Sequence, residues 1–325
     1  MRRSLIIALS ALLCAAPALA QKKNAKPPPK PPAAAAPAAP APPDPNADLA
    51  FGAYQRGYYL TAFKEASLRA QQNDPQAMTL LGELYSQGLG VGRNDAVAAD
   101  WYKRAAALGD KDAMFALAMF NFEGRGGPRN PQEAIRLFDE AAKRGHPLAA
   151  YDLGLLYLSG KDIPQDFAHA AQLFQIAASA GNPEAQYALA TMYKEGRGVP
   201  KDIAKAAQLL EAASVAGNLD AMVEFAIAQF NGEGTAKNES AAANLFLRAA
   251  RLGSPIAQDR LSRILMAGRG MPANPTEAVK WHLIAKAGGS TDAQLDDFVA
   301  KQSKDVRAAA EQSAQKWLAT ARPRS

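Results

Sequence analysis

Residues 74–109 read DPQAMTLLGELYSQGLGVGRNDAVAADWYKRAAALG, and this stretch carries the strongest structural signal because its pattern recurs along the chain. A glycine recurs every 36 residues, at Gly109, Gly145, Gly181, Gly217 and Gly253. The same series has Asn73 at the preceding position and Gly289 at the following one. Further series with the same spacing begin at Gly88, Ala77 and Ala105. Repetition of this length without an insertion is typical of a solenoid of stacked repeats, here about six.

Each copy predicts two helices. In the first copy a helix spans about residues 75–87 and ends at Gly88, where glycine supplies a left-handed cap. The second helix follows an Asn or Asp whose side chain can accept hydrogen bonds from free amides. This residue is Asn94, Asn130, Asp166, Asp202, Asn238 or Asn274. Glu133 and Glu277, three residues after their caps, predict capping boxes. The loop between the helices usually contains a second glycine, such as Gly90, but the third copy has Asp162 there, which predicts a different bend.

Recurring apolar positions predict a shared interior. Leu81, Leu117, Leu153, Leu189, Phe225 and Leu261 mark the first helices, and Trp101, Leu137, Leu173, Leu209, Leu245 and Trp281 mark the second helices. One hairpin cannot cover its own apolar face, so each depends on its neighbours and the terminal units must differ. Residues 48–72 are expected to form a degenerate half-repeat, with Ala62 in register with Ala98. Residues 291–325 are expected to form capping helices and a tail, anchored by Phe298 and Trp317.

The first copy contains the string Asp74-x-x-Ala77, Leu81-Gly82-x-x-Tyr85, Gly88-x-Gly90-Val91, Asn94 and Trp101-Tyr102-x-x-Ala105-Ala106-x-x-Gly109. The fourth copy repeats it at Ala185, Leu189, Tyr193, Gly196, Gly198, Val199, Asp202 and Gly217. These residues resemble Sel1-like repeats, relatives of the tetratricopeptide repeats, over residues 73–290. The resemblance implies an all-α fold, a right-handed α–α superhelix of helix–turn–helix units. It also implies a scaffold or adaptor that binds proteins or peptides.

The first 47 residues differ from the repeats in composition. Arg2 and Arg3 precede an apolar run of about a dozen residues, and Ala18-Leu19-Ala20 provides a small-x-small pattern. Residues 1–20 are therefore expected to be a cleavable signal peptide, cut after Ala20, which predicts a periplasmic or secreted protein. Residues 21–47 are rich in Pro, Ala and Lys and are expected to be a disordered linker. No stable membrane span is expected after cleavage.

Composition argues against several functional classes. Much of the net charge of +6 comes from Arg2, Arg3 and the lysines of residues 21–47, so the repeats are nearly neutral and give no case for nucleic-acid binding. The only cysteine, Cys14, lies in the expected signal peptide. The histidines His146, His169 and His282 do not have the spacing of metal ligands. We therefore expect no cofactor, no metal and no enzymatic activity.

In related solenoids of helix pairs the first helix lines the concave surface. With Leu81, Gly82 and Tyr85 as register, Thr79, Glu83 and Ser86 would face this surface, because they are spaced i, i+4, i+7. The matching residues of the next four copies are apolar or aromatic in most places, and the last copy has Asp259, Arg263 and Met266. The candidate binding residues are Phe115, Met119, Phe122, Tyr151, Leu155, Leu158, Tyr187, Thr191, Lys194, Val223, Ile227 and Phe230. An exposed apolar stripe of this length indicates an interaction site, whereas tight superhelical curvature would bury it.

Together these observations predict an exported, non-enzymatic adaptor or regulator that binds a protein or peptide of the cell envelope on its concave face. One alternative is a module that binds cell-wall glycan or peptide, since rings such as Tyr151 and Tyr187 could stack on sugars. A hydrolase is the remaining alternative, although no constellation of residues supports it. The sequence leaves the oligomeric state open.

Overall fold

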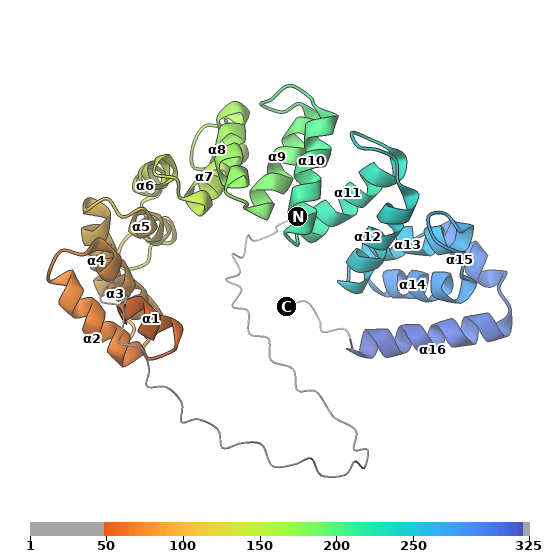
Figure 1. Ribbon diagram of the computed structural model, residues 1–325, viewed down its shortest axis with the longest axis horizontal. Coiled ribbons are helices and arrows are strands. Elements are labelled where there is room, and N and C mark those ends of the chain that lie inside the picture. Colours follow the sequence, from red (N-terminus) through yellow and green to blue (C-terminus); the bar gives the residue numbers. More distant parts are fainter. Residues whose placement is uncertain (1–48, 321–325) are drawn as a thin grey trace, which may run out of the picture. The chain divides into compact units, whose positions relative to one another are not determined.

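The computed structural model describes residues 49–320, and every described secondary-structure element is helical (Figure 1). The signal peptide and the linker expected at residues 1–47 lie outside the described residues, as do residues 321–325. The helices of the first half are α1 (Leu49–Gln55), α2 (Tyr59–Ala70), α3 (Pro75–Gln87), α4 (Asp95–Ala107), α5 (Lys111–Glu123), α6 (Pro131–Lys143), α7 (Pro147–Ser159) and α8 (Phe167–Ser179). Those of the second half are α9 (Pro183–Glu195), α10 (Ile203–Val215), α11 (Leu219–Asn231), α12 (Glu239–Arg251), α13 (Pro255–Ala267), α14 (Pro275–Ala287), α15 (Ala293–Ala300) and α16 (Lys304–Thr320).

The predicted hairpins are confirmed, from α3–α4 to α13–α14. Each packs on the next in chain order, and every helix of the six hairpins has 13 residues. In Figure 1, α5 and α7 lie toward the inner side of this row of hairpins, and α6 and α8 lie toward its outer side. The expected repeat architecture is therefore present.

Side chains at the predicted caps make the expected hydrogen bonds. Asn94 Oδ1 accepts from the amide of Val97 at 3.1 Å, and the corresponding Asn or Asp caps every second helix of the other five hairpins. The predicted capping boxes are wrong in one respect: Glu133 and Glu277 do not accept a hydrogen bond from the backbone amide of the cap residue. These carboxylates pair with Arg136 and Lys280 instead.

The backbone explains why the capping boxes are absent. The cap residue's own N–H already has an acceptor, a carbonyl near the end of the first helix of the same hairpin. Asn130 donates to the Asn121 carbonyl at 2.7 Å, and Asn274 donates to the Leu265 carbonyl at 2.9 Å. A glutamate three residues further on therefore finds no free amide to accept from. This hydrogen bond closes the loop of each hairpin.

The second loop glycine is required by the preceding hairpin. Gly198 has φ +69°, and a Cβ built on it would lie 2.2 Å from the carbonyl oxygen of Phe167, at the start of α8. In the described part of the chain, Asn73 is the only residue other than glycine with positive φ. Asp162 therefore does not adopt the left-handed conformation of the glycines at this loop position, and the loop of the third copy bends differently, as the sequence predicts. Asp162 instead forms an ion pair with Arg129 at 3.1 Å.

The interior contains one series of side chains that the sequence interpretation missed. Tyr102, Phe138, Phe174 and Phe246 are among the largest fully buried side chains, and each stands one residue after the predicted core position. The ring of Tyr102 crosses α3 where a Cβ on Gly82 would lie 2.5 Å away, which explains the Leu-Gly pair of the first copy. Of the predicted set, Leu81 is fully buried, whereas Trp101, Leu209 and Leu245 are half-buried.

The ends differ from the repeats. Residues 49–70 form a complete hairpin with a shortened first helix, α1–α2, rather than half a repeat. Ala62 is fully buried, as Ala98 is. At the other end α16 packs against α14, and the ring centroids of Trp317 and Trp281 lie 6.0 Å apart. None of the helices between residues 49 and 320 is long and apolar enough to cross a bilayer.

Candidate functional site

The predicted binding positions lie along one wall, which we call the inner wall: the face that α3, α5, α7, α9, α11 and α13 present at these positions. Three pockets open between neighbouring hairpins on this wall. The first contains Thr79, Glu83 and Phe115, the second contains Lys194 and Ile227, and the third contains Ile227 and Phe230. The structure therefore brings predicted positions of adjacent copies together, as a shared surface requires.

Most of the candidate residues are half-buried. The sequence allowed either a fully exposed apolar stripe or a buried one, and the observed exposure is intermediate. Lys194 is exposed, whereas Val223 is only 3% exposed and presents no surface to a partner. The half-buried residues are Phe115, Met119, Phe122, Tyr151, Leu155, Leu158, Tyr187, Thr191, Ile227 and Phe230. These side chains are therefore partly covered by the protein itself and partly accessible to a partner.

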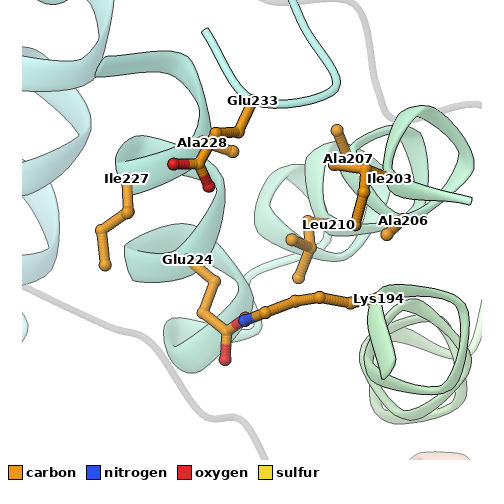
Figure 2. Close-up of a pocket in the computed structure, with 9 residues that line it drawn as sticks. All are labelled: Lys194, Ile203, Ala206, Ala207, Leu210, Glu224, Ile227, Ala228 and Glu233. Carbon is orange, nitrogen blue, oxygen red and sulfur yellow. The ribbon is translucent and has the colours of Figure 1, made fainter. Parts of the chain in front are cut away.

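Polar contacts hold the middle of the inner wall in place. The hydroxyl of Tyr187 on α9 donates to Glu224 on α11 at 2.9 Å, and Lys194 reaches the same carboxylate at 2.8 Å. Figure 2 shows Lys194 extending to Glu224 across the second pocket, with Ile203 and Leu210 of α10 on its other side. Burial and the Glu224 carboxylate raise the pKa of Tyr187, so its hydroxyl stays a donor. These contacts fix the relative placement of α9 and α11.

The first pocket is the largest of the three, with a volume of 570 Å³, and we call it the acidic pocket. It lies between α1, α3 and α5, and its lining includes Glu83, Asp110 and Asp112 and no lysine or arginine. Asp110 caps α5 by accepting from the Ala113 amide at 2.7 Å, and it also accepts from the Thr79 hydroxyl at 3.1 Å. Glu83 accepts from the Tyr102 hydroxyl at 2.9 Å.

The third pocket, of 330 Å³, has the opposite charge, and we call it the basic pocket. It lies between α11 and α13 and is lined by Arg260, Arg263 and Arg269, without a carboxylate. Arg263 pairs with Asp292 at 2.5 Å. Arg269 pairs with Glu239, and its guanidinium lies 4.6 Å above the ring of Phe230. Arg260 is exposed and has no hydrogen-bond or ion-pair partner among residues 49–320.

Sequence reasoning missed the roles of two further residues. His146, which was considered from the sequence only as a metal ligand and dismissed, is buried, caps α7 and lines the acidic pocket. Its signal was available: it occupies the cap position that is Asp74, Asp110, Asn182, Asn218 or Ser254 in the other copies. Asp152 on α7 is the other, because burial raises the pKa of its carboxyl to about 6.

Comparison with known proteins agrees with this architecture. A family model described as the Sel1 repeat matches six consecutive segments, residues 75–110, 111–146, 147–182, 183–218, 219–254 and 255–290. A comparison with the curated proteins gave no match.

Among solved structures, the chain is similar to a Sel1 repeat protein from Oxalobacter formigenes, with 29% identity and a TM-score of 0.61 over 77% of this chain and 100% of that one. It is also similar to c5321, a protective antigen present in uropathogenic Escherichia coli strains displaying an SLR fold, with 25% identity and a TM-score of 0.53. This second match covers 80% of this chain and 64% of that one. With the six contiguous repeats, these likenesses establish that the chain belongs to the Sel1 repeat family.

Proposed function

We propose that this protein is a non-enzymatic scaffold that holds an extended segment of a protein partner along its inner wall. Sel1 repeats mediate protein–protein interaction, which makes a protein the expected class of ligand. The observation that carries the proposal is that three pockets open at predicted positions of neighbouring first helices. The first contains Thr79, Glu83 and Phe115, and the second and third share Ile227.

The shape of the wall favours an extended segment over a folded domain. Half-buried side chains of the middle hairpins lie between the first pocket and the second and third pockets, so a chain lying across the helices meets pockets at both ends of this stretch. Large, rigid rings such as Tyr151 lose little conformational entropy when they are covered. Backbone polar groups of an extended partner can be satisfied by wall residues such as Lys194 and Arg260, which are exposed.

The proposal is tested by photo-crosslinking from single positions of the full chain. A photo-reactive residue replaces Tyr151 or Leu158 on the inner wall, and Glu211, exposed on α10, serves as the matched control position. We expect a discrete crosslinked partner from the inner positions only, identified by mass spectrometry and then purified. The purified partner should bind the Tyr151→Ala and Ile227→Ala variants at least about tenfold more weakly than the unmodified chain. Crosslinks from Glu211 alone, or unchanged affinity in folded variants, would contradict the assignment of this wall.

We further propose that the protein works in the cell envelope, as a periplasmic or secreted adaptor. The support is the charged start, apolar run and small-x-small pattern of residues 1–20. Amino-terminal sequencing of the protein recovered from the producing cell tests this, and the expected first residue is Gln21. An intact Met1 on the protein from the cytoplasm alone would contradict it.

A further inference from the structure

The acidic pocket has a surplus of negative charge that its own hairpins do not neutralise. Glu83 accepts hydrogen bonds from Tyr102 and Gln87, both uncharged donors. Asp110 accepts from an amide and a hydroxyl. No lysine or arginine forms an ion pair with Glu83 or Asp110 within residues 49–320.

The cations nearest the acidic pocket leave this surplus in place. Asp112 lies 3.4 Å from His146 Nε2, which is neutral unless protonated. The Lys111 ammonium is exposed and donates to the Gly145 carbonyl at 3.3 Å. The Arg125 guanidinium, which acts to lower the pKa of Tyr102, pairs with Asp95 at 3.0 Å. The negative charge also affects two tyrosines beside the pocket. The pKa of Tyr54 and that of Tyr102 are raised mainly by burial and, to a smaller extent, by the Glu83 carboxylate.

Rings form much of the remaining lining. Phe51 and Tyr54 of α1 stand on one side, and Phe115 of α5 stands on the other, stacked on His146. Phe51 is 48% exposed, which is unusual for a large ring. Carboxylates beside aromatic faces are a favourable setting for a guanidinium or ammonium, which is attracted by both the charge and the ring quadrupole. A volume of 570 Å³ is enough for a long cationic side chain together with an apolar neighbour.

The charged side chains that line the first and third pockets therefore differ in sign, and Arg260 is the arginine of the third pocket that has no carboxylate partner among the described residues. The acidic pocket lies in the first two hairpins after α2, and the basic pocket, with the unpartnered guanidinium of Arg260, lies between α11 and α13. A uniformly charged partner would be repelled at one of the two ends, since like charges brought together cost free energy. Such a wall selects the direction in which a segment lies as well as its composition.

We propose that the acidic pocket binds an arginine or lysine flanked by apolar residues on an extended segment of the protein partner. This inference rests on the proposed function, because it names the chemistry of the partner at one end of the same wall. The cation lies between the carboxylates of Glu83 and Asp112, its stem lies against Phe51 and Phe115, and the apolar neighbour packs toward Leu80 and Ala116. The segment then continues along the inner wall toward the basic pocket.

The test uses labelled peptides and the full chain, with fluorescence anisotropy as the readout. The probe has one arginine between two leucines in a glycine–serine background, and its counterparts carry norleucine or glutamate in place of arginine. The variant combines Glu83→Gln, Asp110→Asn and Asp112→Asn, in which asparagine at 110 keeps the helix cap. Glu211→Gln, an exposed carboxylate on α10 without a partner among the described residues, is the matched control.

We expect the unmodified chain to bind the arginine peptide at least about tenfold more tightly than the norleucine peptide, and the glutamate peptide most weakly. The triple variant should lose this preference, whereas Glu211→Gln should keep it, and added salt should reduce it. If the triple variant fails to fold, Asp112→Asn alone replaces it, because the Asp112 side chain is 65% exposed. Equal affinity for the three peptides, no binding of the arginine peptide, or an unchanged preference in the variant would overturn the inference. Crosslinks at Tyr151 and Leu158, outside this pocket, decide the proposed function separately.

Discussion

The ring of Phe115 on α5 stacks on the imidazole of His146, with centroids 4.5 Å apart and an angle of 21° between the planes. His146 is at the same time the cap of α7, since its Nδ1 accepts from the Ala149 amide at 3.0 Å. Because Nδ1 must be unprotonated to accept, the ring proton lies on Nε2 and points toward Asp112. One side chain thus joins an inner-wall ring, a helix start and a carboxylate of the acidic pocket.

The free energy of unfolding should depend on the protonation of His146. Burial lowers its pKa, with Lys111 acting in the same direction and Asp112 and Asp110 against it. The neutral form is therefore favoured in the folded chain. Its contribution is fully present above the unfolded pKa of about 6.5 and is lost as pH falls toward the folded value. Denaturant unfolding between pH 5 and pH 8 measures this loss, and His146→Asn, a cap that does not titrate, should flatten this part of the profile. An identical profile in both chains would contradict the role of the cap.

Replacing Asp152 with asparagine should stabilise the protein at neutral pH. Desolvation raises the pKa of this carboxyl to about 6, and no ion pair or hydrogen bond to another described residue offsets the cost of its charge. A shift of this size corresponds to about 3 kcal/mol. The gain from Asp152→Asn should be fully present above pH 6, should decrease as pH falls from 6 toward 3.8, and should disappear below 3.8, where the carboxyl is protonated in both states. Urea unfolding at pH 7.5 and pH 4.5 measures it, with Glu211→Gln as a neutral control. A destabilised variant at pH 7.5 would show that the carboxylate is compensated.

Gly198→Ala should destabilise the chain more than Gly181→Ala. Both glycines have positive φ, so alanine is strained at either position by about 1 kcal/mol. Only at Gly198 would the new methyl group also meet a backbone oxygen, that of Phe167 at 2.2 Å, whereas Gly181 has no atom within 4 Å. We expect a loss of on the order of 3 kcal/mol for Gly198→Ala, measured by urea unfolding. Equal losses would mean that the preceding hairpin can move away at no cost.

Trp317→Ala should loosen the carboxyl-terminal end. The indole of Trp317 packs edge-on against that of Trp281, and α16 covers the last repeat through this contact. Removing a half-buried indole should cost about 2 kcal/mol. Leu318→Ala, at the next position and 40% exposed, should cost less than about 0.5 kcal/mol. Hydrogen exchange of the α14 amides should accelerate in the first variant and not in the second, and equal rates would exclude α16 as a structural cap.

The sequence predicted correctly those features that depend only on a few neighbouring residues. Glycine at 88 in a left-handed cap, asparagine at 94 as an N-cap and the fixed spacing between copies were each predicted and confirmed, because each depends on a few neighbouring residues. The capping boxes failed for a reason that is not local. The cap amide is already bonded to the preceding helix, which only the three-dimensional path of the loop reveals.

The sequence predicted which residues lie on the inner wall, but it did not predict how exposed their side chains are. Spacing along a helix places Phe115 and Ile227 on one face, whereas exposure depends on how far each hairpin is rotated against the next. Val223 shows the difference, since it shares the predicted register and is nevertheless buried. The acidic pocket was missed because its side chains come from α1, α3, α5 and the cap of α7, which no single motif joins.

The hydrogen bond that closes each loop, such as that from Asn130 to Asn121, lies wholly within one hairpin. Copying or deleting one complete period therefore recreates the same junction on both sides, with every closing bond intact. Genes for such chains can lengthen or shorten by unequal recombination without a broken intermediate. The number of hairpins can then change in whole steps, while the atypical units at the two ends are carried along unchanged.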